Sequence, residues 1–98
     1  MPIFYPRGKE WIKKEKEKAK KLKQTSWWRK KKSSGICYYC KRKFKPQELT
    51  MDHKIPLSRG GESIKENLVP CCKECNSKKK HLLTIEWKEY ISQLKNQM

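Results

Sequence analysis

The sequence is short of apolar residues and contains almost no aspartate or histidine. Hydrophobic residues make up 35% of the 98 residues, and charged residues make up 37%. A chain of this size with so little apolar material buries a small core, and such domains often need a staple. No apolar run approaches the ~20 residues of a membrane helix, and the first residues contain no signal-peptide core. We therefore expect a soluble, cytoplasmic protein with no membrane partner.

The charge is strongly positive and unevenly distributed. The net charge is +16, and residues 1–45 carry 17 basic residues against 3 acidic ones, whereas residues 46–98 carry 9 against 7. A basic segment of this density indicates a polyanionic partner, such as DNA, RNA or an anionic membrane surface. The alternative is a solvated tail that repels itself.

Two regions follow from this pattern. Residues 9–32 are rich in Lys and Glu and contain no Pro or Gly, which predicts a basic helix with a weak apolar stripe at Ile12, Ala19 and Leu22. Ser33, Ser34 and Gly35 end it. We expect a basic helical arm over residues 1–34 and a second region over residues 35–98.

The second region combines short strands with helices. Alternating apolar residues predict a strand from Leu49 to Ile55, and residues 67–70 predict a second strand that Pro70 cuts off. A short helix should follow the last cysteines. Thr84 is a plausible N-cap for a final amphipathic helix, whose apolar face would carry Trp87, Tyr90, Ile91 and Leu94. These elements predict an α+β fold.

Four of the five cysteines form two pairs with metal-ligand spacing. Cys37 and Cys40 stand two residues apart, as do Cys72 and Cys75, with 31 residues between the pairs. Two such knuckles brought together make a tetrahedral structural zinc site, which has no open position for catalysis. Cys71 could replace Cys72 as a ligand, but its spacing to Cys75 is wrong, so we expect a buried apolar residue there.

The only aspartate, Asp52, stands next to His53, one of only two histidines. Alternation along a strand sends their side chains to opposite sides, and a bend would let a carboxylate hold a metal while the imidazole faces water. Hard cations such as Mg²⁺ prefer oxygen ligands, and Asn76 offers a second oxygen directly after the last zinc cysteine.

With these residues in order, the segment 35–80 resembles the HNH endonuclease family, in its zinc-containing branch. The motif is carried by Cys37-x2-Cys40, Asp52-His53, Arg59-Gly-Gly61, Asn67 and Cys72-x2-Cys75-Asn76-x2-Lys79. The resemblance implies a small zinc-stabilised ββα-metal core, also called a His-Me finger. The predicted basic N-terminal helix and C-terminal amphipathic helix flank this core.

The resemblance implies roles at the matching positions. His53 would be the general base, Asp52 and Asn76 would hold one catalytic Mg²⁺ or Mn²⁺, and Asn67 would brace the loop and orient His53 by backbone hydrogen bonds. The reaction would be hydrolysis of DNA phosphodiester bonds, with RNA as the alternative substrate, leaving 5′-phosphate and 3′-hydroxyl ends. Histidine suits this role because its pKa lies near neutral pH. Phage packaging and restriction systems are the settings in which such small chains occur.

Basic residues around the motif are candidates for phosphate contacts. These are Arg59, Lys78, Lys79 and Lys80, with a solvated face as the alternative. His81 lies five residues after Asn76, which puts it off the same helical face, so we favour phosphate or solvent over metal. For Trp27 and Trp28 we favour core packing over base stacking.

Two other functions compete with the nuclease. A non-catalytic zinc-containing DNA- or RNA-binding module would need the cysteines and lysines but would have no use for Asp52, His53 and Asn76 together. A zinc scaffold for protein partners fits poorly with the charge of +16. The sequence specifies neither a recognition site nor an oligomeric state.

Overall fold

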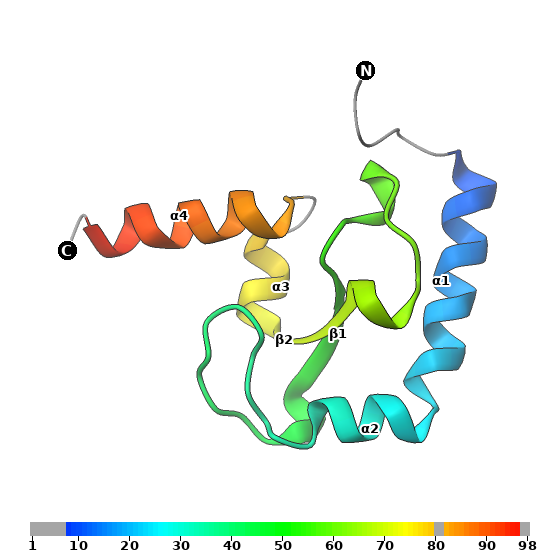
Figure 1. Cartoon of the computed structure of the whole chain (residues 1–98), viewed down its shortest axis with the longest axis horizontal. Coiled ribbons are helices and arrows are strands. Elements are labelled where there is room, and N and C mark those ends of the chain that lie inside the picture. Colours follow the sequence, from blue (N-terminus) through cyan, green and yellow to red (C-terminus); the bar gives the residue numbers. More distant parts are fainter. Residues whose placement is uncertain (1–7, 80–81, 97–98) are drawn as a thin grey trace.

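The computed structural model describes residues 8–79 and 82–96, so Lys80 and His81 lie outside the described part of the chain. Figure 1 shows a two-stranded hairpin surrounded by helices. The helices are α1 (Lys9–Lys23), α2 (Ser26–Lys32), α3 (Lys73–Lys79) and α4 (Thr84–Asn96), and the strands are β1 (Leu49–His53) and β2 (Leu68–Cys72). The α+β prediction is confirmed. None of the helices described is long and apolar enough to cross a membrane.

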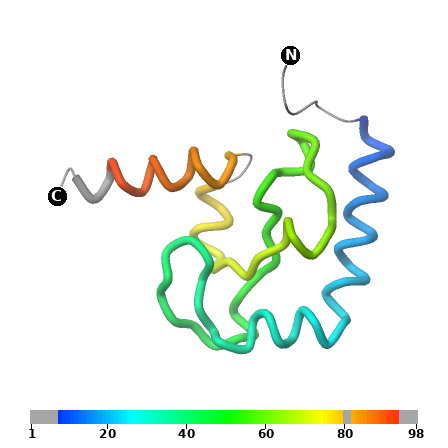
Figure 2. The backbone as a smooth tube through the Cα atoms, viewed as in Figure 1, coloured from blue at the N-terminus to red at the C-terminus, as the bar shows by residue number. Residues whose placement is uncertain are grey.

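The single basic helix expected over residues 9–32 is in fact two helices. Thr25 caps α2, because its hydroxyl oxygen accepts from Trp28 N at 3.4 Å while its proton goes to Leu22 O at 2.6 Å. Because Thr25 bonds both the last turn of α1 and the first turn of α2, the chain changes direction at this residue. Figure 2 shows α2 running across the end of α1. Trp28 is buried as expected, and Trp27 is half-buried with Lys65 over its ring.

The hairpin is antiparallel, with Leu49 paired to Cys72 at one end and His53 paired to Leu68 at the other. Pro70 lies inside β2 and does not end it, contrary to the prediction. Its carbonyl accepts from Tyr38 N at 2.9 Å, so that side of the residue faces away from β1. The proline nitrogen, which carries no hydrogen, points the same way, so the proline removes no hydrogen bond between β1 and β2.

The main cluster of buried side chains is small, and cysteine makes up half of it; Ala19, Trp28 and Leu68 are buried outside this cluster. Its members are Cys37, Tyr39, Leu49, Val69, Cys71, Cys72, Cys75 and Trp87. Cys71 is fully buried, as expected, and lies in β2. A core with so few large apolar side chains depends for its stability on the bonds that the cysteines form.

The final helix begins differently from the prediction. Thr84 is the first helical residue, and its hydroxyl donates to Lys54 O at 3.4 Å. The side chain of Glu86 instead accepts from Leu83 N at 2.8 Å. Trp87 is buried, Ile91 is half-buried and Tyr90 is exposed but stacked on Trp87, whereas the side chain of Leu94 lies outside the described part.

Candidate functional site

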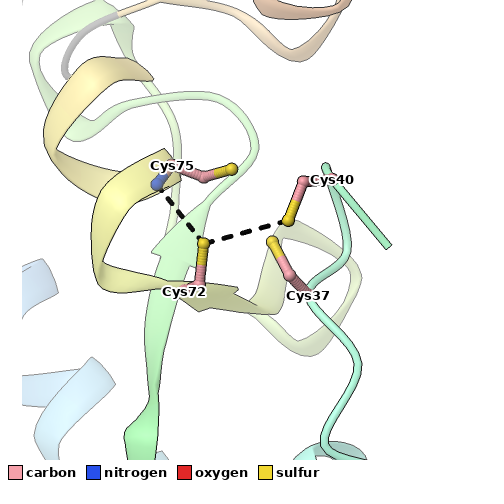
Figure 3. Close-up of side chains that lie close together, drawn as sticks. All are labelled: Cys37, Cys40, Cys72 and Cys75. Carbon is pink, nitrogen blue, oxygen red and sulfur yellow. Dashed lines mark hydrogen bonds between the residues drawn. The ribbon is translucent and has the colours of Figure 1, made fainter. Parts of the chain in front are cut away.

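Four cysteine sulfur atoms converge at the Leu49–Cys72 end of the hairpin. The sulfurs of Cys37, Cys40, Cys72 and Cys75 all lie within 4.8 Å of one another, and Figure 3 shows them gathered around a common centre. Four thiolates around one zinc ion, each at about 2.3 Å, stand about 3.8 Å apart. Cys40 Sγ and Cys72 Sγ are 3.9 Å apart. Geometry and donor chemistry therefore both fit a metal such as zinc, on the ligand set that the sequence predicted.

Polar groups around the cluster suit a site of negative charge. Cys75 N donates to Cys72 Sγ at 3.4 Å, and Arg42 Nε donates to Cys40 Sγ at 3.3 Å. Arg42 also pairs with Glu74 at 3.0 Å, and these contacts raise the pKa of its guanidinium, Cys40 contributing most. A permanent cation beside four thiolates offsets their charge.

At the other end of the hairpin, three of the four residues predicted for catalysis and its metal line one pocket of about 430 Å³, whereas Asn67 lines a separate pocket. The lining of the shared pocket includes Asp52, His53 and Asn76, as well as Ile12 and Lys16. The three residues come from β1 and α3, and Ile12 and Lys16 come from α1. Figure 1 shows α1 running alongside the segment that joins the two strands. The hairpin, α3 and α1 thus bring together side chains that are far apart in the sequence.

Asp52 is buried and held by two donors on the same oxygen. Its Oδ2 accepts from the Tyr39 hydroxyl at 2.5 Å and pairs with Lys79 Nζ at 3.2 Å. Lys79 is fully buried and also donates to His53 O at 3.1 Å. Burial raises the pKa of Tyr39, and the negative charge of Asp52 adds to this, so the phenol remains a donor. This network fixes the carboxylate and ties α3 to β1.

The position of Lys79 contradicts the phosphate contact expected from the sequence. A lysine with no exposed surface, whose ammonium is bound to Asp52 and a backbone carbonyl, is a structural cation. Its charge is retained in the interior because it is paired.

His53 lines the same pocket as Asp52, together with Ile12 and Lys16 of α1. Its Nε2 lies 2.9 Å from Ser63 Oγ, in the loop between the strands. Burial lowers the pKa of His53, while the charges of Asp52 and Glu15 oppose the effect. A lowered pKa keeps the imidazole neutral at neutral pH, which is the form that accepts a proton.

The amide of Asn76 has its orientation fixed by Thr50. Asn76 Nδ2 donates to Thr50 Oγ1 at 2.8 Å, and Thr50 Oγ1 donates to Cys71 O at 2.8 Å. Because the one hydroxyl proton is committed to a carbonyl, the hydroxyl can only accept from Asn76. The amide nitrogen therefore faces Thr50, and Oδ1 remains available as an oxygen ligand.

Asn67 braces the loop that follows β1. Its Oδ1 accepts from Ile55 N at 2.8 Å, and its Nδ2 donates to Ile55 O at 3.0 Å and Glu62 O at 2.9 Å. Gly61 packs so closely on this loop that an added Cβ would lie 1.7 Å from Ile55 O. These contacts fit the predicted bracing. The backbone O of Asn67 accepts from Lys54 N, one residue beyond His53, at 2.8 Å.

The other basic candidates lie at the surface in ion pairs. Arg59 pairs with Glu86, and Lys78 pairs with Glu74 at 3.0 Å. Both side chains are solvent-accessible, so phosphate contacts remain a prediction for them. Lys80, the fourth candidate, and His81 fall outside the described residues.

Sequence reasoning missed Glu15 and Ser63, which connect α1 to His53. Glu15 Oε1 accepts from Ser63 N at 2.7 Å, and Ser63 Oγ donates to Glu15 O at 2.5 Å. Burial raises the pKa of Glu15, but hydrogen bonds from Lys18 and Ser63 outweigh burial, and the net shift is downward. The signal was present: Glu15 falls at helical spacing within the apolar stripe of Ile12, Ala19 and Leu22, where a carboxylate needs a partner.

The fold and the cysteine cluster define a small α+β protein with a potential zinc site at one end of a hairpin and, at the other end, a pocket lined by Asp52, His53 and Asn76. A family model described as HNH endonuclease matches residues 37–88, which is more than half of the chain. The chain belongs to the HNH endonuclease family. A comparison with curated proteins gives no match.

Proposed function

We propose that the protein is a DNA endonuclease in which His53 activates water and Asp52 and Asn76 hold one Mg²⁺ or Mn²⁺. Membership of the family supports a nuclease acting on nucleic acid. The observation that supports the residue roles is the shared pocket, because His53, Asp52 and Asn76 all line it. The non-catalytic binding module has no need of this arrangement.

The donor set around the pocket suits a hard cation. Both contacts made by Asp52 use Oδ2, and the contact made by Asn76 uses Nδ2. The remaining Oδ1 atoms of the two residues are the oxygen ligands that Mg²⁺ and Mn²⁺ favour. A bound ion would stabilise the negative charge that develops on the leaving oxygen.

The protein side chains have distinct tasks in this mechanism. His53, held neutral by burial, accepts the proton of the attacking water. Lys79 and Tyr39 hold the Asp52 carboxylate in place, and Asn67 holds the loop that carries the other side of the pocket. Cleavage in this manner would leave 5′-phosphate and 3′-hydroxyl ends.

Lysines of the N-terminal arm provide a route for the phosphate backbone into the pocket. Lys16 lines the pocket beside His53 and also lines a neighbouring hollow along α1, with three further lysines at helical spacing. Those three are Lys13, Lys20 and Lys23. Lys23 and Lys32 in turn line a hollow that reaches Asn76. Glu17 lines the same hollow along α1, so four lysines stand there against one carboxylate. Such an excess of cations beside the proposed site is suited to a polyanionic strand.

A plasmid-nicking assay with a metal series tests the proposal. The wild-type protein should nick supercoiled DNA with Mg²⁺ or Mn²⁺, and His53→Ala should lower the rate at least ~100-fold, since a general base contributes about 10²–10⁴-fold. Binding to DNA, measured by fluorescence anisotropy, should be unchanged in His53→Ala. Wild-type protein that binds but never cuts, with any divalent ion, would establish the binding module instead.

A further inference from the structure

The N-terminal helix reaches the proposed general base through two buried residues. Ser63 is 4% exposed and Glu15 is 3% exposed, and they contact one another through both backbone and side-chain atoms. Glu15 lies in α1, outside the residues 37–88 that match the family model. In Figure 1, α1 runs alongside the segment that joins β1 to β2, which contains Ser63.

The hydrogen-bond directions around the Ser63 hydroxyl are determined by counting protons. Ser63 Oγ lies 2.5 Å from Glu15 O and 2.9 Å from His53 Nε2. A carbonyl can only accept, so the single hydroxyl proton goes to Glu15 O. The hydroxyl oxygen must then accept from His53, which places a proton on Nε2.

We infer that Glu15 and Ser63 are positioning residues that hold His53 in the tautomer with hydrogen on Nε2 and a lone pair on Nδ1. The inference rests on the proposed role of His53 as the base. Nδ1 is then the atom that takes the proton from water, and the Nε2–H bond keeps the ring from rotating.

Glu15 acts on Ser63 through two atoms at once. Its backbone oxygen orients the hydroxyl, and its carboxylate holds the Ser63 N–H at 2.7 Å, so the serine is fixed relative to α1. Lys18 compensates the charge of this carboxylate at 2.9 Å. The basic helix therefore has a second task besides attracting phosphate: it sets the hydrogen-bonding state of the base.

Nitrogen-15 NMR of the imidazole tests the inference without any need for cleavage. The chain has two histidines, so a His81→Gln background leaves His53 as the only source of imidazole signals. We expect correlations typical of a neutral ring protonated at Nε2. A ring protonated at Nδ1 in this otherwise unchanged protein would overturn the inference directly.

Two substitutions extend the test to catalysis. Ser63→Ala removes the acceptor, so the Nε2–H preference should disappear and kcat should fall about 10-fold or more, part of what a general base contributes. KM for plasmid DNA should remain within about twofold. Glu15→Gln retains an oxygen acceptor for Ser63 N and the backbone carbonyl, so it should retain the tautomer. Ser77→Ala, an exposed serine of α3, is the matched control.

The outcomes separate the two proposals. An unchanged tautomer and an unchanged kcat in a folded Ser63→Ala protein would refute the positioning role. A tautomer that changes in Ser63→Ala, in a protein that never nicks DNA, would support the hydrogen-bond relay and refute the proposed function. If Ser63→Ala does not fold, the wild-type spectrum still decides the question, since a ring protonated at Nδ1 refutes the inference and a ring protonated at Nε2 supports it.

Discussion

At one end of the β1–β2 hairpin, where Leu49 pairs with Cys72, four cysteines bring together two distant turns of the chain. At the other end, where His53 pairs with Leu68, the same task falls to hydrogen bonds and a buried ion pair. The first arrangement uses one residue type at fixed spacing. The second uses several residue types that meet only in the folded chain.

The difference shows how a small core can support a polar pocket. Sulfur ligands around a metal would supply stability that the limited apolar surface does not, because metal-binding free energy becomes folding free energy. The other end of the hairpin contains buried charge in the ion pair of Lys79 with Asp52. An intact buried ion pair contributes little net stability. The cysteine end would therefore stabilise the fold, and this stability would allow the other end to hold its polar side chains in fixed positions.

Breaking the cysteine cluster should have the largest effect. Zinc contributes about 10–16 kcal/mol in small zinc-finger peptides, which matches or exceeds the total stability of about 5–15 kcal/mol of a typical domain. Cys72→Ser should therefore abolish cooperative thermal unfolding and remove bound zinc, as measured by circular dichroism and elemental analysis. A chelator should have the same effect on the wild-type protein.

Cys71→Ala provides the matched control for that experiment. Cys71 is equally buried and adjacent in sequence, but its sulfur is not one of the four that converge. This variant should retain one zinc per chain and a cooperative transition. Equal loss of zinc in both variants would show that the ligand set is wrong.

Breaking the polar end should be the next largest effect. Lys79→Met removes one partner of a buried pair and leaves Asp52 with Tyr39 alone, which costs about 3–5 kcal/mol. For a domain of this size the melting temperature should fall by more than ~10 °C. Lys78→Met changes an exposed neighbour that pairs with Glu74 at the surface, and it should leave the melting temperature nearly unchanged. Equal shifts in the two variants would contradict the structural role of Lys79.

The two ends also differ in how well the sequence predicts them. The cysteine ligands could be named from spacing alone, because two knuckles of fixed length need only to be brought together. The short helix that contains Cys75 and the strand that ends at His53 also agree with the sequence, within about two residues. Asp52, His53 and Asn76 were singled out by residue type and position, and the family resemblance added Asn67 and a role for each residue.

What the sequence did not reveal depends on burial by distant segments. A lysine in a basic run normally faces solvent, and nothing local marks Lys79 as the partner of Asp52. Glu15 was likewise hidden among exposed glutamates, although its place in the apolar stripe was a signal. The break at Thr25 and the outward-facing nitrogen of Pro70 depend on side-chain and backbone directions that composition does not give.

The smallest of the three effects should come from a substitution at Thr50. Its hydroxyl donates to Cys71 O, next to the cysteine cluster, and accepts from Asn76 Nδ2, which lines the pocket. Thr50→Val preserves the shape but removes the acceptor, so the Asn76 amide is free to rotate and its oxygen no longer points to one place. Loss of such an outer partner typically costs about 10–100-fold in metal affinity or activity. We expect the Mn²⁺ concentration for half-maximal nicking to rise by that factor, with zinc content and melting temperature close to wild type.

Thr50→Ser restores the hydroxyl and should restore the metal dependence. An unchanged Mn²⁺ requirement in Thr50→Val would show that Asn76 does not depend on Thr50 for its orientation, and the link between the two ends of the hairpin would then be limited to the backbone.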